Sequence, residues 1–179
     1  MTKFKIIACI NQKMALGKEG KLLYKIRNDL KNFASMTSFN GVVIMGRRTF
    51  ESLPNGEPLK GRINIIMTSN REFGIEPKYD NVYIVHSLKD AVELCDAFFY
   101  DKEVFVIGGE SIYRQFMEAD LVDEMRLTIV NDDEDGDVFF PQYNEEDWYV
   151  YYKSMAQVSS NDNVDKSFYY VILKKKENG

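Results

Sequence analysis

Short apolar runs separated by amphipathic segments dominate the first two thirds of the chain. The run from Phe4 to Ile10 is almost unbroken and too short for a buried helix, so it predicts a strand covered on both faces. Four later runs share this character, at residues 41–46, 63–68, 82–85 and 104–107. Helical spacing predicts helices at residues 29–38, 48–52, 88–98 and 111–117. Strands that alternate with helices predict a parallel α/β sheet.

The pattern changes after Asp120. Three strands are predicted with no helix between them, at residues 125–130, 148–157 and 168–174. The polar residues 159–164 predict the hairpin loop between the last two strands. With 179 residues, the chain is long enough for one domain with its own core. We therefore expect a single α/β domain over residues 1–179, with a central, mostly parallel eight-stranded sheet, flanking helices and an antiparallel C-terminal edge.

Composition and charge exclude several classes of protein. The net charge of −5 leaves no basic stripe for nucleic acid. No apolar run approaches the ~20 residues of a membrane helix, and the N-terminus is too short in apolar length for a signal peptide. His86 is the only histidine, which argues against a histidine metal site or triad. Cys9 and Cys95 lie in apolar contexts and are expected to be reduced core thiols, so the sequence predicts a cytoplasmic protein.

The acidic segment 131–136 opens like a calcium loop, with oxygen ligands at its first, third and fifth positions and Gly136 at the sixth. The twelfth position, however, is Gln142 rather than Glu, and no flanking helix is predicted. A solvated acidic loop is therefore the favoured interpretation, and no metal site is expected.

Asp29 borders the apolar face of the first predicted helix, within one turn of Leu30 and Phe33. A carboxylate at the edge of an apolar stripe suits a site that holds a flat, polar heterocycle against hydrophobic walls. Alternatively, Asp29 is a first-turn acid that faces solvent and interacts with the helix dipole. The helix alone does not decide between these interpretations.

Three turns follow predicted strands and carry groups suited to anions or to a flat ligand. Residues 46–50 bring two arginines and a threonine to a helix start, and residues 68–71 add hydroxyls and a third arginine. Two such neighbouring turns suggest a dinucleotide with a 2′-phosphate, which Arg47 and Ser69 can bind. The pair Gly108–Gly109 permits close backbone approach to a flat ligand. Each turn taken alone is equally consistent with solvated arginines or a tight turn.

Several motifs in a fixed order identify the chain as similar to dihydrofolate reductase, from Phe4 to about Leu173. They are Ile7–Ala8 with Gly17, Leu30 and Phe33 behind Asp29, residues 43–52, 58–66 and 106–113, Leu127–Thr128, residues 136–141 and Asp147–Trp148. The resemblance implies that the protein reduces 7,8-dihydrofolate to 5,6,7,8-tetrahydrofolate with NADPH, as a monomer, for one-carbon metabolism and thymidylate synthesis, and that it is a target of antifolates. Hydride would reach C6 of the pterin, and a proton would reach N5 through water.

The resemblance also implies residue roles. Asp29 would bind the pterin, with Thr128 bracing it and Tyr24 contributing to the water network. The substrate site would consist of Ile7, Cys9, Leu22, Asp29, Phe33, Leu53, Leu59, Arg62, Ile107 and Thr128. Arg62 would clamp the α-carboxylate of the substrate's glutamate. The cofactor site would consist of Ala8, Leu16, Gly17, Gly46, Arg47, Arg48, Thr49, Thr68, Ser69, Ile107, Gly108, Gly109, Glu110, Ser111, Ile112 and Tyr113.

The chain departs from the family pattern in the segment 23–27, which lacks the usual Pro-Trp pair and a second proline. Without these prolines, we expect altered open and closed populations of the loop that precedes Asp29. Ala34 replaces a lysine near the folate tail, with Lys31 as a possible substitute. Two alternatives stay open: the NADPH-dependent reductase of riboflavin synthesis, which shares the fold, and a domain that binds nucleotide without turnover.

Overall fold

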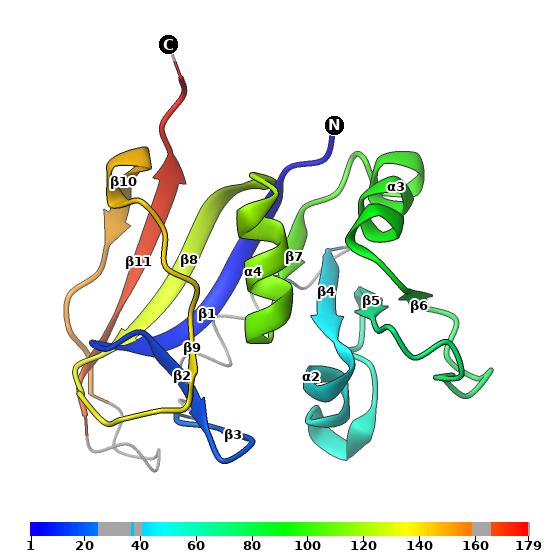
Figure 1. Cartoon of the computed structure of the whole chain (residues 1–179), viewed down its shortest axis with the longest axis horizontal. Helices are drawn as coiled ribbons and strands as arrows, with labels where there is room; N and C mark the ends of the chain where they lie inside the picture. Colours follow the sequence, from blue (N-terminus) through cyan, green and yellow to red (C-terminus); the bar gives the residue numbers. More distant parts are fainter. Residues whose placement is uncertain (25–36, 38–40, 159–165, 179) are drawn as a thin grey trace.

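An eight-stranded sheet forms the centre of the molecule, in the order β10-β11-β8-β1-β7-β4-β5-β6 (Figure 1). The computed structural model describes residues 1–24, 37, 41–158 and 166–178. The strands of this sheet are β1 Phe4–Asn11, β4 Val42–Gly46, β5 Ile63–Met67, β6 Val82–Val85, β7 Val104–Val106, β8 Val122–Val130, β10 Trp148–Lys153 and β11 Phe168–Lys175. Strands β8, β1, β7, β4, β5 and β6 run parallel, whereas β11 is antiparallel to both β8 and β10. The predicted fold class is confirmed.

Helices cover both faces of the sheet because its inner strands are apolar on both sides. The described helices are α2 Arg47–Glu51, α3 Leu88–Phe98 and α4 Glu110–Glu118, with short 3₁₀ turns at Pro54–Gly56 and Glu145–Asp147. Alternate residues of β1 enter two different cores: Phe4 and Ile6 pack with α3 and α4, whereas Ile7 packs with Phe50 of α2. The predicted helix at residues 29–38 and the hairpin loop at 159–164 lie outside the described residues, apart from Thr37. None of the described helices is long and apolar enough to cross a membrane.

A second, three-stranded sheet was not predicted. It has the order β3-β2-β9, with β2 at Ala15–Lys18, β3 at Lys21–Leu22 and β9 at Val138–Phe139. Two left-handed residues, Glu19 with φ 52° and Gly20 with φ 77°, form the turn between β2 and β3. Strands of two to four residues carry too little periodicity to be recognised in a sequence, which explains the omission.

Strand β10 is shorter than predicted, because it ends at Lys153 instead of continuing to Gln157. The Ser154 side chain, rather than a further strand residue, accepts the hydrogen bond of the Tyr170 backbone N–H, at 2.8 Å. Gln157 forms only an isolated bridge with Phe168. Strand β8 is longer than predicted at its start and adds Val122, Asp123 and Glu124.

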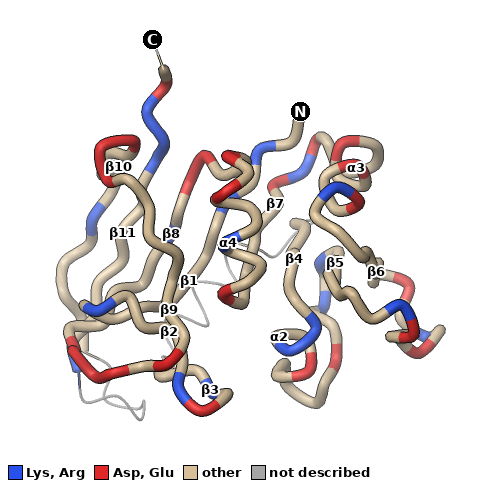
Figure 2. The backbone as a smooth tube through the Cα atoms, in the orientation of Figure 1, with Lys and Arg blue, Asp and Glu red and all other residues tan. Residues whose placement is uncertain are grey.

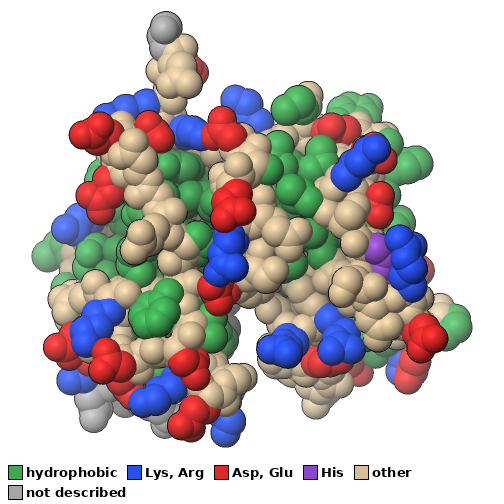
Figure 3. Space-filling view, in the orientation of Figure 1, with side chains coloured by type: hydrophobic (Ala, Val, Ile, Leu, Met, Phe, Trp, Pro, Cys, Tyr) green, Lys and Arg blue, Asp and Glu red, His purple; other side chains and the backbone are tan. Residues whose placement is uncertain are grey.

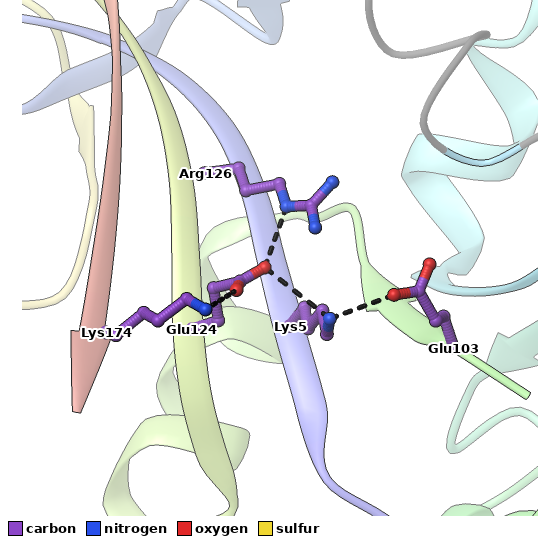
Figure 4. A network of polar contacts seen from close by, with 5 residues as sticks. All are labelled: Lys5, Glu103, Glu124, Arg126 and Lys174. Atoms are coloured by element: carbon purple, nitrogen blue, oxygen red, sulfur yellow. Dashed lines mark hydrogen bonds and ion pairs between the residues drawn. The ribbon is translucent and has the colours of Figure 1, made fainter. Parts of the chain in front are cut away.

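A buried carboxylate joins three strands of the large sheet. Glu124 on β8 is 6% exposed and lies 2.7 Å from Arg126 Nε, 3.6 Å from Lys5 Nζ and 3.7 Å from Lys174 Nζ (Figure 4). Lys5 also binds Glu103, at 3.0 Å. Three cations around one buried carboxylate compensate its loss of hydration and connect β1, β8 and β11 near the ends opposite the turns described next.

Candidate active site

Three predicted turns lie together at the carboxyl ends of β7, β4 and β5. The Gly46 backbone N–H donates to the Gly108 carbonyl at 2.9 Å, and the Ile107 N–H donates to Ile44 at 2.9 Å. Gly46 pairs in register with Met67, so Thr68 follows β5 beside it. The parallel sheet thus brings together three turns that are widely separated in the sequence.

The Gly108–Gly109 turn presents backbone where most residues would present a side chain. Its peptide bond is cis, and Gly108 has a φ of 127°. A Cβ atom on Gly108 would lie 3.3 Å from the Tyr113 hydroxyl and 3.6 Å from Thr49 Oγ1. The Tyr113 hydroxyl itself donates to the Ile7 carbonyl at 2.8 Å, which ties α4 to β1. The result is a cradle of bare backbone at Gly108 and Gly109, which Tyr113 ties to Ile7.

The start of α4 adds anion-binding capacity next to this cradle. The N-cap of α4 is Gly109, which has no side chain to cap the helix. The backbone N–H groups of the first turn therefore have no side-chain cap. Glu110 in the first turn forms an ion pair with Arg114, and Ser111 beside it is exposed. Ile112 is buried and packs 3.2 Å from the position of a Cβ on Gly46, which explains the glycine there.

Arginine side chains flank the same region from α2. Arg47 and Arg48 occupy the first turn of α2, directly after Gly46, and Thr49 lies half-buried beside the glycine pair. In the space-filling view the surface is hollowed between the β2–β3 side and the α2 side, with Lys or Arg side chains at the rim over α2 (Figure 3). This arrangement suits a phosphorylated ligand that enters along the hollow.

The turn after β5 is partly ordered by its own hydrogen bonds. The Thr68 hydroxyl accepts the Asn70 N–H at 3.1 Å, and Ser69 is exposed. His86, to which no role was assigned from the sequence, places Nδ1 at 2.7 Å from the Thr68 carbonyl. Since a carbonyl only accepts, Nδ1 carries a hydrogen there.

Most of the described residues expected to form the apolar wall of the substrate site pack in one core cluster. Ile7, Leu53, Leu59 and Ile107 all pack in the cluster that contains Phe50. Cys9 joins a different cluster, which contains Tyr24.

Leu22 is the exception, since it lies on β3 and is 63% exposed. Ala8 and Leu16 are buried in the opposite core, and Gly17 pairs with Leu22. Phe33 lies outside the described residues.

Thr128, the predicted partner of the acid, is buried in the large sheet. It is 3% exposed on β8, directly opposite Cys9 of β1 and Tyr170 of β11. Asp29, the predicted carboxylate, lies outside the described residues. The structure therefore fixes the position of Thr128 only.

Hydrogen bonds to described residues hold Arg62, whose guanidinium is half-buried. Its Nε donates to Thr37 Oγ1 at 2.8 Å, and an Nη donates to the Lys60 carbonyl at 3.0 Å. Burial lowers the pKa of Arg62 below its ordinary value, yet the group stays charged. Thr37 was missed in the sequence, where nothing distinguishes it from other polar helix residues.

Asn64 was also missed, although its signal is visible as a lone amide in an apolar strand. It is fully buried in β5; its Oδ1 accepts the Leu59 N–H at 3.0 Å, and its Nδ2 donates to the Leu59 and Arg62 carbonyls at 3.0 and 3.1 Å. One side chain therefore positions both a wall residue and the arginine.

Tyr24 is buried and bound to the acidic loop. Its hydroxyl donates to Asp132 Oδ2 at 2.5 Å and accepts from Asn11 Nδ2 at 3.1 Å. Burial, followed by the hydrogen bond to Asp132, raises the pKa of Tyr24 well above its ordinary value. Asn11 also donates to the Glu134 carbonyl, so this segment and the acidic loop are joined twice.

The acidic loop between β8 and β9 docks on the β1–β2 segment instead of being merely solvated (Figure 2). The Asp137 N–H donates to Gly17, and its carboxylate accepts the Glu19 N–H, both at 3.0 Å. Lys13 Nζ lies 2.7 Å from Asp135. Among the described residues, no three or more His, Cys, Asp or Glu side chains are grouped so as to hold a metal.

Comparison with known proteins identifies relatives of this fold and site. The family model "Dihydrofolate reductase" matches residues 3–174. Dihydrofolate reductase of Staphylococcus aureus is 31% identical over 170 residues, covering 95% of this chain and 98% of the relative. The bifunctional dihydrofolate reductase-thymidylate synthase of Daucus carota is 33% identical over 167 residues, covering 88% of this chain and 31% of that protein.

A solved structure gives the same result. Dihydrofolate reductase from Enterococcus faecalis, complexed with NADP(H) and RAB-propyl, has a TM-score of 0.80 and 27% identity, and covers 98% of this chain and 97% of its own. With a family match over nearly the whole length, the chain belongs to the dihydrofolate reductase family.

Proposed function

We propose that this protein reduces 7,8-dihydrofolate to 5,6,7,8-tetrahydrofolate with NADPH, and thereby supports one-carbon metabolism and thymidylate synthesis. The observation that carries the proposal is the glycine cradle: Gly46, Gly108 and Gly109 meet beside Ile7, where a flat ring can lie against backbone. The apolar cluster on one side of it and the arginines on the other match a pterin and a dinucleotide.

The residues present fit NADPH. The nicotinamide would lie against the backbone of Gly108 and Gly109, where a Cβ on Gly108 would instead press on Tyr113, and the first turn of α4 supplies backbone N–H groups that no side chain caps. Arg48 and Thr49 would bind the pyrophosphate, and Arg47 with Ser69 the 2′-phosphate. When bound there, NADPH supplies the hydride that reaches C6 of the substrate.

On the substrate side, the cluster of Ile7, Phe50, Leu53, Leu59 and Ile107 would hold the pterin and the neighbouring ring. Arg62 would bind the α-carboxylate of the glutamate tail, because a half-buried guanidinium held by Thr37 is oriented and weakly hydrated.

Asp29 would be the ionisable group of the pterin pocket, braced by Thr128. A carboxylate in an apolar cleft is poorly hydrated and stabilises positive charge on the pterin, which makes C6 a better acceptor. The carboxylate would not reach N5, so the proton would arrive through water that the segment 11–24 admits or excludes.

The proposed site is contained in one copy of the chain. Turnover therefore requires neither a second copy nor nucleic acid, and a competitive antifolate that occupies the pterin pocket would inhibit it.

The test compares the parent with Asp29→Asn, following loss of NADPH absorbance with 7,8-dihydrofolate between about pH 5 and about pH 9. Asp101→Asn, at an exposed loop position, serves as the matched control. Parent turnover that falls as pH rises, with Asp29→Asn slow at neutral pH and partly restored in acid, supports the proposal. A folded parent that binds NADPH without reducing dihydrofolate contradicts it, and turnover of a ribosylamino-pyrimidine would instead indicate the riboflavin-pathway reaction.

A further inference from the structure

The edge strand β10 exposes an unusual amount of apolar surface. Four consecutive residues are each about half exposed: Tyr149 at 45%, Val150 at 58%, Tyr151 at 60% and Tyr152 at 51%. The strand forms one end of the large sheet, and no other described strand pairs with its outer side (Figure 1). An open edge of this kind is a template for pairing with another chain.

A β-bulge places all three tyrosines on the same face. Val150 pairs with Leu173 and Tyr152 pairs with Ile172, so Tyr151 is the extra residue. Lys174, which pairs with Tyr149, places its ammonium 3.8 Å from the centre of the Tyr151 ring. Since Lys174 and Ile172 point to the same side of β11, their neighbours Tyr149, Tyr151 and Tyr152 form one tyrosine patch.

Of the usual protections of an edge strand, β10 has the bulge at Tyr151 and one terminal lysine. Trp148 to Tyr152 contain neither a charge nor a proline, and Lys153 is the only charged residue of the strand. The opposite edge of the sheet, β6, has four residues, and its half-exposed Tyr83 already packs edge-on against Phe99. The open apolar edge is therefore specific to β10.

We propose that β10 pairs with β10 of a second copy of this chain, antiparallel about a twofold axis near Val150. The charges favour this occupant. Glu145, Glu146 and Asp147 precede the strand and Lys153 ends it, so a twofold brings the acidic end of each copy beside the basic end of the other. Two copies with a net charge of −5 each repel one another overall. The pairing of the acidic end of one β10 with Lys153 of the other is therefore the electrostatic attraction that favours the dimer.

The interface is small, so the dimer is weak. Six half-exposed tyrosine rings, with the two valines and the strand backbones, bury on the order of 1,000 Å². That area is typical of a transient dimer that forms at micromolar or higher concentration. The family resemblance implies a monomer, and the proposal adds a weak dimer in equilibrium with it. The dimer leaves the proposed active site open, because β11 and β8 separate β10 from β1.

Sedimentation velocity over a concentration series tests the proposal. We expect the parent to shift from a monomer of 20.8 kDa towards twice that mass as concentration rises. Tyr152→Lys should abolish the shift, whereas Tyr100→Lys should keep it, because Tyr100 is an even more exposed tyrosine, at 76%, outside the edge strands. Circular dichroism and turnover, unchanged in both variants, show that each is folded.

Charge reversal tests the antiparallel register. Lys153→Glu should weaken association at least threefold, and Glu146→Lys combined with Lys153→Glu should restore it. A parent that stays monomeric up to about 1 mM overturns the proposal. A dimer that tolerates both Tyr152→Lys and Lys153→Glu places the contact elsewhere and overturns it as well.

Discussion

The Tyr24 hydroxyl donates a 2.5 Å hydrogen bond to the Asp132 carboxylate, across 108 positions of the sequence. Tyr24 is only 7% exposed, and Asn11 completes the hydroxyl's hydrogen bonding. The segment that leads to the predicted acid is thereby attached to the acidic loop at a position where the family usually has tryptophan. The contact gives this protein its own means of holding that segment.

Tyr24→Phe should loosen this attachment. It leaves the partly buried Asp132 carboxylate and the buried Asn11 amide each short of one partner, which should lower the free energy of unfolding by about 1–3 kcal/mol. Because loop opening often limits product release, we expect steady-state turnover to change more than the single-turnover rate. Urea unfolding and stopped-flow measurements check both.

Tyr143→Phe is the matched control for this change, because the half-buried Tyr143 has no hydroxyl hydrogen bond among the described residues. Equal effects of the two substitutions on stability and kinetics would show that the Tyr24–Asp132 contact has no special role.

Arg62→Lys should weaken binding of the substrate's tail. A bidentate, charge-assisted contact becomes a single ammonium contact, so we expect KM for dihydrofolate to rise roughly ten- to hundredfold with kcat little changed. A dihydropterin without the glutamate tail should show the same kinetics in parent and variant. A rise in KM for the tailless substrate of the same size would assign Arg62 a general structural role instead.

Glu124→Gln should destabilise the sheet. The substitution preserves shape but leaves Lys5, Arg126 and Lys174 around a neutral amide, and we expect a loss of about 2–4 kcal/mol in unfolding free energy. Glu118→Gln, at an exposed position on α4, controls for removal of one negative charge. Matching urea midpoints for the two variants would argue against the network.

Stability should fall in strongly alkaline solution partly through Cys95. Burial raises the pKa of this thiol to about 12 in the folded protein, above its ordinary value of 9.0. The folded state then retains a proton that the unfolded state releases, so the contribution is intact below about pH 9 and is lost as pH rises towards about 12. Cys95→Ala should flatten the decline measured by urea titration, and an identical decline would exclude the thiol as its source.

Sequence periodicity predicted the large sheet well because its strands are buried on both faces. The run Phe4–Ile10 became β1 nearly residue for residue, and the change of pattern after Asp120 correctly marked the antiparallel edge. The three site turns were each predicted to follow a strand, and they lie at one edge because parallel strands align their carboxyl ends.

Side-chain partnerships were less accessible to prediction. Nothing local in the sequence pairs Tyr24 with Asp132 or Arg62 with Thr37, because each contact spans segments that only the fold brings together. The small sheet was not predicted for another reason. Strands β3 and β9 have two residues each, which is too few for a period of hydrophobicity to be recognised. The exposure of Leu22 follows directly from its place on that sheet.

The amide of Asn64 binds Leu59 and Arg62 at the same time. The part of the proposed site that would contact a ring and the part that would contact a carboxylate therefore share one anchor inside β5. Affinity for both ends of the substrate can then change through a single substitution in the core, at a position that no ligand touches. Selection by an inhibitor could act on this strand without altering the surface of the pocket.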